Sequence, residues 1–259
     1  MASLTRRVID WAAAFEDGAI IRAAFFGLLT ATGVILYLDY TEMSARKGAA
    51  TTPDLSPILP AFDPAAPGGT PGPAVTTPMD VLRQPLEVRL TAGGVLALTG
   101  TINSGAADRV AAEIAAHGEY IRTVALDSPG GAVAEALAIG KLIREKGYVT
   151  TVAAGSLCAS SCPLVFAGGR ERLATYRSAI GVHQIYAAAP AGSLTSRLAA
   201  AGNAMSDAQT LTAEISRYLA AMGIDAEVWL RALETPPDKL TYFSPAELTG
   251  LKLATRLTK

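Results

Sequence analysis

Three short stretches of the sequence carry groups that could together perform acyl transfer. Ser160 and Ser161 lie at a strand-to-helix bend, and Gly130 and Gly131 lie at a similar bend earlier in the chain. His183 ends a later apolar strand. A serine nucleophile, a histidine base and backbone N–H groups that bind an oxyanion are the parts that this chemistry needs. Each stretch alone is ordinary structural chemistry, and only the combination favours a reactive site.

The elements that must position these residues alternate regularly between strand and helix from residue 86 onward. The sequence predicts strands at 86–90, 95–100, 121–127, 149–155 and 252–257, and paired strands or a hairpin within 170–184. It predicts helices at 106–117, 132–146, 162–169, 207–222, 225–234 and 245–251. Asn103 or Ser104 is expected to cap the first of these helices. This alternation predicts an α/β fold with a mainly parallel sheet. Ligands of such folds bind at the carboxyl ends of the strands, where both bends lie.

Composition excludes one broad class of function. The chain has 22 basic and 23 acidic residues, and half of its residues are hydrophobic. A nucleic-acid partner would require a basic face, and no cluster of basic residues predicts one. We therefore expect no nucleic-acid binding.

An apolar stretch near the N-terminus predicts a membrane anchor. Residues 19–40 contain twenty consecutive positions, 19–38, in which Arg22 is the only charge. Twenty helical residues span the roughly 30 Å hydrocarbon layer, and an arginine near one end can reach the interface. The alternatives are a buried helix or a cleaved signal peptide. The sequence has no clean small-x-small cleavage site between the apolar stretch and the charged residues after it. Residues 1–18 would then be a cytoplasmic segment.

The charges that flank this stretch favour one orientation in the membrane only weakly. Arg6 and Arg7 favour a cytoplasmic N-terminus, whereas Arg46 and Lys47 on the other side oppose it. Residues 41–84 follow as a Pro/Gly/Ala-rich linker, and the part from 48 to 80 holds eight prolines of the fifteen in the chain. Such a composition predicts a disordered, extended tether, and the alternative is an ordered coat on the surface of the domain. The globular domain is expected at 85–259.

Three motifs in order resemble the proteolytic subunits of the Clp protease family, within the ClpP/crotonase fold. They are DSPGG at 127–131, CASSCPLVFAGG at 158–169 and VHQ at 182–184. The resemblance extends over about 86–256 and is greatest to membrane-associated periplasmic relatives. It implies an α/β, ClpP/crotonase-like fold with repeated ββα-type units, a peptide or protein substrate, assembly into homo-oligomers, and no cofactor or metal.

The resemblance also assigns roles to individual residues. It implies that Ser160 is the nucleophile, with Ser161 as the rival, and that His183 is the general base. The oxyanion hole would be formed by the N–H groups of Gly130 or Gly131 and of Ser161. In the family an aspartate completes the triad shortly before the last helical segment.

The aspartate of such a triad matches this sequence least well. Asp238 is the nearest candidate, but it lies about two residues further upstream than the family pattern expects. Its alternative role is a surface carboxylate. Asp127 is expected to cap its turn rather than to join a triad. His117, at the end of a predicted amphipathic helix, is expected to be a solvated surface residue.

A serine–lysine mechanism, as in other membrane-bound relatives of this fold, is the alternative for the base. The chain has no lysine between Lys146 and Lys239. Lys141 and Lys146 fit the polar face of a helix. The sequence therefore favours His183.

Both cysteines of the chain flank the serine pair. Cys158 and Cys162 lack the further ligands that a zinc site needs. In an oxidising compartment they are expected to form a disulfide that holds the bend around Ser160. The alternative is two reduced, buried cysteines in a cytosolic domain. A disulfide would indicate a domain in the periplasm, and hence a single-pass protein of the bacterial inner membrane.

The leading hypothesis is therefore a membrane-anchored, periplasmic serine hydrolase of the peptidase type. The first alternative is a catalytically degenerate member of the same family that serves as a binding or scaffold module. The second is an acyl-coenzyme-A enzyme of the crotonase type, which would not need a Ser–His pair.

Overall fold

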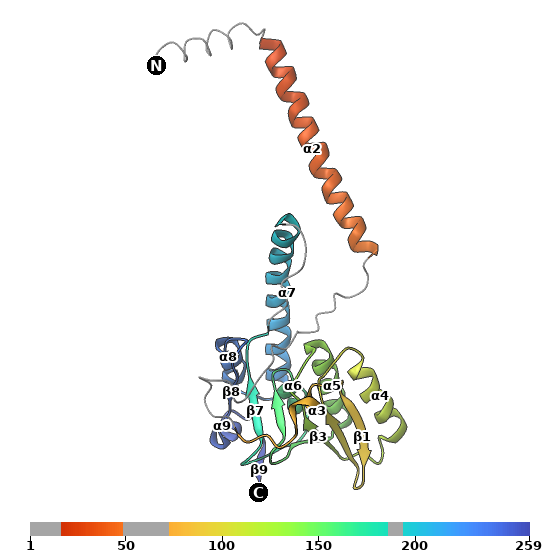
Figure 1. Cartoon of the computed structure of the whole chain (residues 1–259), viewed down its shortest axis with the longest axis vertical. Helices are drawn as coiled ribbons and strands as arrows, with labels where there is room; N and C mark the ends of the chain where they lie inside the picture. The colour runs from red at the N-terminus through yellow and green to blue at the C-terminus, as the bar shows by residue number, and fades with distance from the viewer. Residues whose placement is uncertain (1–16, 49–72, 186–193) are drawn as a thin grey trace. The chain divides into compact units, whose positions relative to one another are not determined.

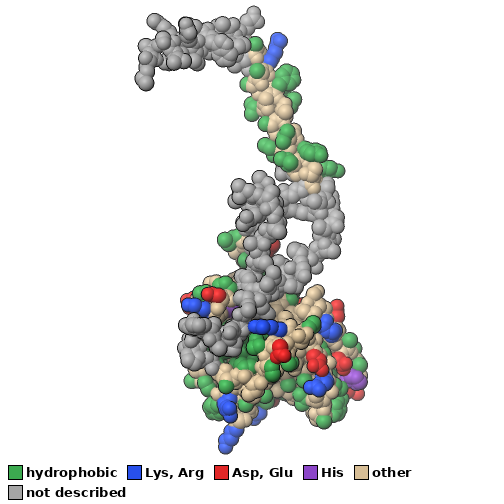
Figure 2. Space-filling view, viewed as in Figure 1, with side chains coloured by type: hydrophobic (Ala, Val, Ile, Leu, Met, Phe, Trp, Pro, Cys, Tyr) green, Lys and Arg blue, Asp and Glu red, His purple; other side chains and the backbone are tan. Residues whose placement is uncertain are grey.

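The computed structural model describes residues 17–48, 73–185 and 194–259, and the chain divides into two compact units, Met1–Asp54 and Leu55–Lys259. The first unit contains the helix α2 (Asp17–Gly48), and the second contains the domain (Figure 1). Large apolar side chains of α2, such as Phe25, Leu28 and Leu36, are more than half exposed. Figure 2 shows hydrophobic side chains along this helix. Residues 21–38 of this helix are long and apolar enough to cross a membrane. The helix continues to Gly48, eight residues beyond the predicted end of the membrane segment.

A six-stranded sheet forms the centre of the domain, in the order β1-β2-β3-β4-β6-β9. Its strands are β1 (Glu87–Thr91), β2 (Val95–Thr99), β3 (Thr123–Asp127), β4 (Val149–Val152), β6 (Arg172–Thr175) and β9 (Arg256–Thr258). Only β1 and β2 pair antiparallel, around the Gly93-Gly94 turn. The predicted α/β class with a mainly parallel sheet is therefore confirmed.

A second, three-stranded sheet carries the segments that lead to Ser160 and His183. It has the order β5-β7-β8, with β5 (Leu157–Ala159), β7 (Ala179–Val182) and β8 (Thr241–Tyr242). The sequence did not predict β5 or β8, and the prediction of a hairpin or paired strands within 170–184 is wrong. In the structure β6 pairs with β4 and β9, whereas β7 pairs with β5 and β8. The reason is that every residue of β7 is buried. A fully buried strand needs a neighbouring strand on each side, which β5 and β8 provide and a two-stranded hairpin would not.

The helices connect the strands and cover the sheets (Figure 1). They are α4 (Ala106–His117), α5 (Val133–Lys146), α6 (Cys162–Ala167), α7 (Leu194–Ala221), α8 (Glu227–Glu234) and α9 (Pro245–Gly250). Fully buried side chains from helices and strands, such as Leu96, Ile139, Phe166 and Ile180, form one continuous core. Helix α7 begins thirteen residues before its predicted start, because the alanine-rich stretch upstream also favours a helix.

The start of α4 differs from the prediction, since neither Asn103 nor Ser104 caps it. The residue before the helix is Gly105, with φ 75°, and no side chain of that segment accepts from the first turn. The N–H groups of Gly105 and Ala107 donate instead to the carboxylate of Glu135 in α5, at 3.1 and 2.7 Å. A carboxylate from a neighbouring helix thus performs the capping, which no local pattern could indicate.

Residues 75–82, which we call the entry segment, pack on the domain although the sequence assigned them to the linker. They include the short helix α3 (Met79–Leu82). Leu82 is fully buried against Leu157, Ala159 and Ala179 of the second sheet. An apolar contact of this kind explains why the proline-rich composition does not extend the tether to residue 84. The middle of the predicted linker, 49–72, lies outside the described residues.

Candidate active site

Ser160 lies in a strained bend between β5 and α6. Its φ is 60°, and Ser160 and Lys252 are the only non-glycine residues with positive φ in the described parts of the chain. This left-handed conformation costs roughly 1–2 kcal/mol for an L-residue. The backbone N–H of Ser160 donates to the carbonyl oxygen of Gly181 in β7, at 3.0 Å. Strain that the surrounding structure maintains in this way is typical of functional positions.

The two cysteines on either side of this bend form a disulfide. Cys158 belongs to β5 and Cys162 begins α6, with their Cα atoms 5.1 Å apart and both side chains fully buried. The bond therefore connects the end of a strand to the first turn of the following helix. Ser160 lies in the short loop that the bond closes.

The glycine turn after β3 contacts the serine bend directly. Gly130 has φ 95°, and a Cβ placed on it would lie 2.6 Å from both Ala159 O and Ser160 Cβ. The N–H of Gly130 donates to Ser128 Oγ at 3.1 Å, so Ser128 and not Asp127 closes this turn. Among the described residues, the N–H groups of Gly131 and Ser161 donate to no protein group. Of the three expected oxyanion donors, these two are therefore available.

His183 directly follows β7, and strand pairing brings it towards the serine. In the parallel pair of β5 and β7, Ala159 is opposite Gly181, so Ser160 and His183 both leave the sheet at the same end. The His183 side chain is 8% exposed. Burial lowers its pKa from the usual 6.5, and the backbone of Gln184 opposes this effect in part. A buried imidazole of this kind is mainly neutral at pH 7, which is the form that can accept a proton.

Ser160, Ser161 and His183 line one small pocket. Its other walls are mostly apolar and come from α5, α6, α7 and α8, for example Val133, Leu164, Leu219 and Trp229. The hydroxyl of Ser161 is buried and, like Nδ1 of His183, has no hydrogen-bond partner in the described parts of the chain. No hydrogen bond joins Ser160 to His183 there either. The structure thus brings the predicted nucleophile and base to one pocket without the bond between them.

Asp238 does not reach this pocket. It is exposed in the turn between α8 and β8, and it forms no hydrogen bond or ion pair within the described residues. Its suggested role rested only on a family pattern that it does not match in position. No carboxylate contacts Nδ1 of His183 in the described residues.

The residue after His183 is held by the end of α8. The backbone N–H of Gln184 donates to Thr235 O at 2.8 Å, and its side-chain amide donates to Leu233 O at 2.6 Å. These bonds fix the segment that carries the imidazole against the helix that forms one wall of the pocket.

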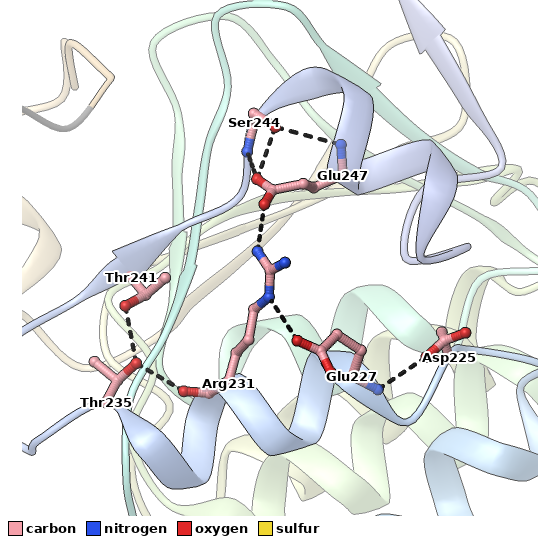
Figure 3. Close-up of polar contacts among 7 residues, drawn as sticks. All are labelled: Asp225, Glu227, Arg231, Thr235, Thr241, Ser244 and Glu247. Atoms are coloured by element: carbon pink, nitrogen blue, oxygen red, sulfur yellow. Dashed lines mark hydrogen bonds and ion pairs between the residues drawn. The ribbon is translucent and has the colours of Figure 1, made fainter.

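A polar cluster connects α8 to its neighbours α9 and β8 (Figure 3). Arg231 of α8 donates to Glu227 at 3.3 Å and also pairs with Glu247 of α9. The Thr235 hydroxyl donates to Arg231 O at 2.7 Å and accepts the hydroxyl of Thr241 in β8 at 2.9 Å. The Arg231 guanidinium and hydrogen bonds from Ser244 hold the pKa of Glu247 at about 2. The cluster therefore joins α8, which forms one wall of the pocket, to α9 and β8.

The other candidate bases lie on the surface. Lys141 pairs with Glu214 at 2.8 Å, and both side chains are about half exposed. Lys146 lies 3.5 Å from its neighbour Glu145. His117 is exposed near Glu113, as predicted. In the part of the chain that the structure describes, no group of three or more His, Cys, Asp or Glu side chains is placed to hold a metal ion.

Asp127 is the residue of this region that sequence reasoning assigned incompletely. Its carboxylate does not cap its own turn. One oxygen accepts the N–H of Leu157 at 2.9 Å, and the other accepts the hydroxyl of Thr77 in the entry segment. Its place at the last position of a strand, directly before the glycine turn, was the only local signal of such a role.

Comparisons with known proteins place the chain in a family. The family model described as Clp protease matches residues 85–218, just over half of the chain. That range contains Ser160, His183 and both turn glycines but ends before Asp238. A solved structure of a ClpP1 point mutant from Listeria monocytogenes is similar over 64% of this chain and 92% of that chain, with 16% identity and a TM-score of 0.49. No curated protein matches the sequence. The span of the family match identifies the chain as a member of the Clp protease family.

Proposed function

We propose that this member of the Clp protease family is a membrane-anchored serine peptidase with Ser160 as nucleophile and His183 as general base. One observation carries the proposal. Ser160, held at φ 60° in a disulfide-closed bend, and the buried His183 line the same pocket, next to a glycine turn with a free N–H group.

The proposed chemistry uses groups of this chain alone. Ser160 Oγ attacks the carbonyl carbon of a peptide bond while His183 accepts the hydroxyl proton. The N–H groups of Gly131 and Ser161 stabilise the resulting oxyanion, and one such donor is typically worth roughly 2.7–4 kcal/mol. Collapse of the intermediate breaks the C–N bond, and the imidazolium gives its proton to the leaving amine. Water, deprotonated by His183, then hydrolyses the ester and restores the serine.

The proposal makes His183 a base without a bonded aspartate. Asp238 would need to move from its exposed turn to serve as the third member. Burial of the imidazole keeps it neutral and ready to accept a proton, but it does not stabilise the imidazolium as a carboxylate would.

Labelling with a fluorophosphonate probe tests the proposal in the full-length protein in detergent. The wild type is expected to be labelled, and Ser160→Ala is expected to abolish labelling. Ser161→Ala is the matched control, because it removes a neighbouring hydroxyl and keeps its backbone N–H. Equal labelling of Ser160→Ala and the wild type would contradict the assignment of Ser160 as the nucleophile.

The anchor and its orientation form a separate part of the proposal. The exposed apolar surface of α2 suits a lipid environment, and the disulfide suits an oxidising compartment. We expect the N-terminus in the cytoplasm and the domain in the periplasm of a bacterial inner membrane. Fusions of alkaline phosphatase and of green fluorescent protein to the C-terminus test this, since the first is active only outside the cytoplasm. A fluorescent fusion without phosphatase activity would overturn the orientation.

A second candidate function has specific support. The missing Ser160–His183 hydrogen bond and the exposed Asp238 favour a catalytically inactive module that binds peptides or serves as a scaffold. An inactive module would resist the probe while still binding peptides to its pocket. Lack of labelling together with peptide binding that Trp229→Ala weakens would favour this function over hydrolysis.

A further inference from the structure

The carboxylate of Asp127 joins three segments of the domain that are far apart in the sequence. Asp127 is the last residue of β3 and directly precedes the glycine turn. Its Oδ1 accepts the Leu157 N–H at 2.9 Å, and Leu157 begins the strand that ends before Ser160. Its Oδ2 accepts the hydroxyl of Thr77, fifty residues earlier in the chain. The half-buried carboxylate of the residue directly before the glycine turn therefore contacts both the strand that leads to Ser160 and the entry segment.

The nucleophile strand has few other attachments on that side. Strand β5 contains only three residues. Beyond the Asp127 bond, Ser128 N–H donates to Leu157 O at 2.7 Å, and Ala159 N–H donates to Ser128 O at 3.0 Å. The Asp127 carboxylate is thus the only side chain among the described residues that hydrogen-bonds the backbone of β5. It fixes how far the start of β5 lies from the turn that supplies Gly131.

The entry segment also contacts β5 and the residues just before it. Thr76 N–H donates to Gly155 O at 2.8 Å, just before β5. Leu82 packs on Leu157 and Ala179, which belong to the two strands that lead to Ser160 and His183. Thr77 adds the bond that orients the Asp127 carboxylate. The segment that enters the domain from the tether is therefore a structural part of the candidate active site.

From these contacts we infer that Asp127, oriented by Thr77, is a positioning residue for the nucleophile. Asp127 does not touch the reacting atoms. It sets the separation between the serine bend and the glycine turn. For Ser160 to attack a carbonyl, this separation must be correct within a fraction of an ångström. The inference rests on the proposed peptidase function.

Conservative variants separate this role from an acid–base role. In Asp127→Asn the amide oxygen can accept the Leu157 N–H while the amide nitrogen donates to Thr77 Oγ1, so both contacts survive without the charge. Asp127→Ala removes both contacts. In the same way Thr77→Ser keeps the hydroxyl and Thr77→Val removes it. Thr91→Val is the matched control, because it deletes one hydroxyl bond in the β1–β2 turn, away from the site.

The experiment measures the rate of fluorophosphonate labelling of the full-length protein. Asp127→Ala is expected to slow labelling by roughly 10- to 100-fold, because small displacements of a nucleophile have effects of this size. Thr77→Val should slow it by about 3- to 10-fold, the equivalent of one lost hydrogen bond. Asp127→Asn, Thr77→Ser and Thr91→Val should stay within about threefold of the wild type. Wild-type rates in Asp127→Ala, or equally slow labelling of Asp127→Asn and Asp127→Ala, would overturn the positioning role.

A second readout does not depend on a reactive serine. Hydrogen exchange of the peptide that contains residues 155–161 should be about fivefold faster in Thr77→Val than in Thr77→Ser, with a peptide from β2 unchanged. If Asp127→Ala fails to fold, the two Thr77 variants decide the question. If the wild type is not labelled, the proposed function fails, and the exchange measurement still tests the strand attachment. Equal exchange in the two Thr77 variants would then contradict the inference.

Discussion

Gly130 and Ser160 lie so close together that a Cβ added to Gly130 would be 2.6 Å from Ser160 Cβ. Real Cβ atoms do not approach one another to this distance, and the added atom would also lie 2.6 Å from Ala159 O. The glycine turn and the serine bend therefore fit together only without a side chain at position 130. This close approach gives the most direct test of the proposed site.

Gly130→Ala is expected to reduce fluorophosphonate labelling by at least about 100-fold, because either the bend or the turn must move. Gly147→Ala is the matched control. Gly147 also has positive φ, at 69°, but nothing lies within 4 Å of the added Cβ. It should cost about 1 kcal/mol of stability and leave labelling unchanged. Normal labelling of Gly130→Ala would show that this turn does not belong to the site.

The pH dependence of labelling should report the buried histidine. Burial lowers the pKa of His183 below 6.5, so the neutral base form persists to a lower pH than for an exposed histidine. The labelling rate should rise with pH through a midpoint below 6.5 and then stay constant to pH 8. A midpoint above 6.5 would contradict the assignment of His183 as a buried neutral base.

The same shift predicts a change in stability. Because the pKa of His183 is lower in the folded state, the unfolded chain binds more protons between the folded pKa and 6.5. The contribution of this group is complete above pH 6.5 and is lost as the pH falls towards the folded pKa. Denaturant unfolding at several pH values should show this loss for the wild type and not for His183→Gln.

The Arg231–Glu247 pair behind the pocket should stabilise the domain in a pH-dependent way. The pKa of Glu247 is lowered from 4.5 to about 2, so its contribution is present above pH 4.5 and disappears as the pH falls towards 2. Since both side chains are partly exposed, Glu247→Gln should cost only about 1 kcal/mol at pH 7.

Urea unfolding at pH 7 and near pH 2 measures this effect. The difference between wild type and Glu247→Gln should vanish at the lower pH. Glu171→Gln serves as the control, because its pair with Arg256 is more exposed, at 3.8 Å. A pH-independent cost of Glu247→Gln would indicate lost helix capping through Ser244 in place of the ion pair.

Loss of the disulfide should disturb the serine bend more than the fold. Closure of such a short loop contributes about 2 kcal/mol by chain entropy. In the double variant Cys158→Ala/Cys162→Ala, the free energy of unfolding measured in urea should fall by this amount. The variant should also be labelled about tenfold more slowly, because the bend is no longer held. Addition of reductant to the wild type should slow labelling to the same extent, and should not affect the double variant. Unchanged labelling of the double variant would mean that the bond has no part in positioning Ser160.

Local patterns in the sequence determined the elements and the order of the candidate residues. The alternation of apolar and polar positions predicted most strands and helices, and the bends after 127 and 159 follow from glycine, proline and serine at strand ends. The capping box of Ser244 and Glu247 likewise involves residues only three positions apart. Such features depend on neighbours within about four residues, and therefore sequence alone suffices for them.

Only the tertiary structure decided which strands pair and which side chains meet. Strands β6 and β7 are separated by three residues yet belong to different sheets, because burial of β7 on both faces outweighs the short connection. The bonds from Asp127 to Thr77 and to Leu157 join residues fifty and thirty positions apart. Asp238 is exposed although a family pattern suggested it for the triad. Long-range pairing and burial are properties of the whole folded chain, whereas the periodicity of the sequence records only the preference of each segment.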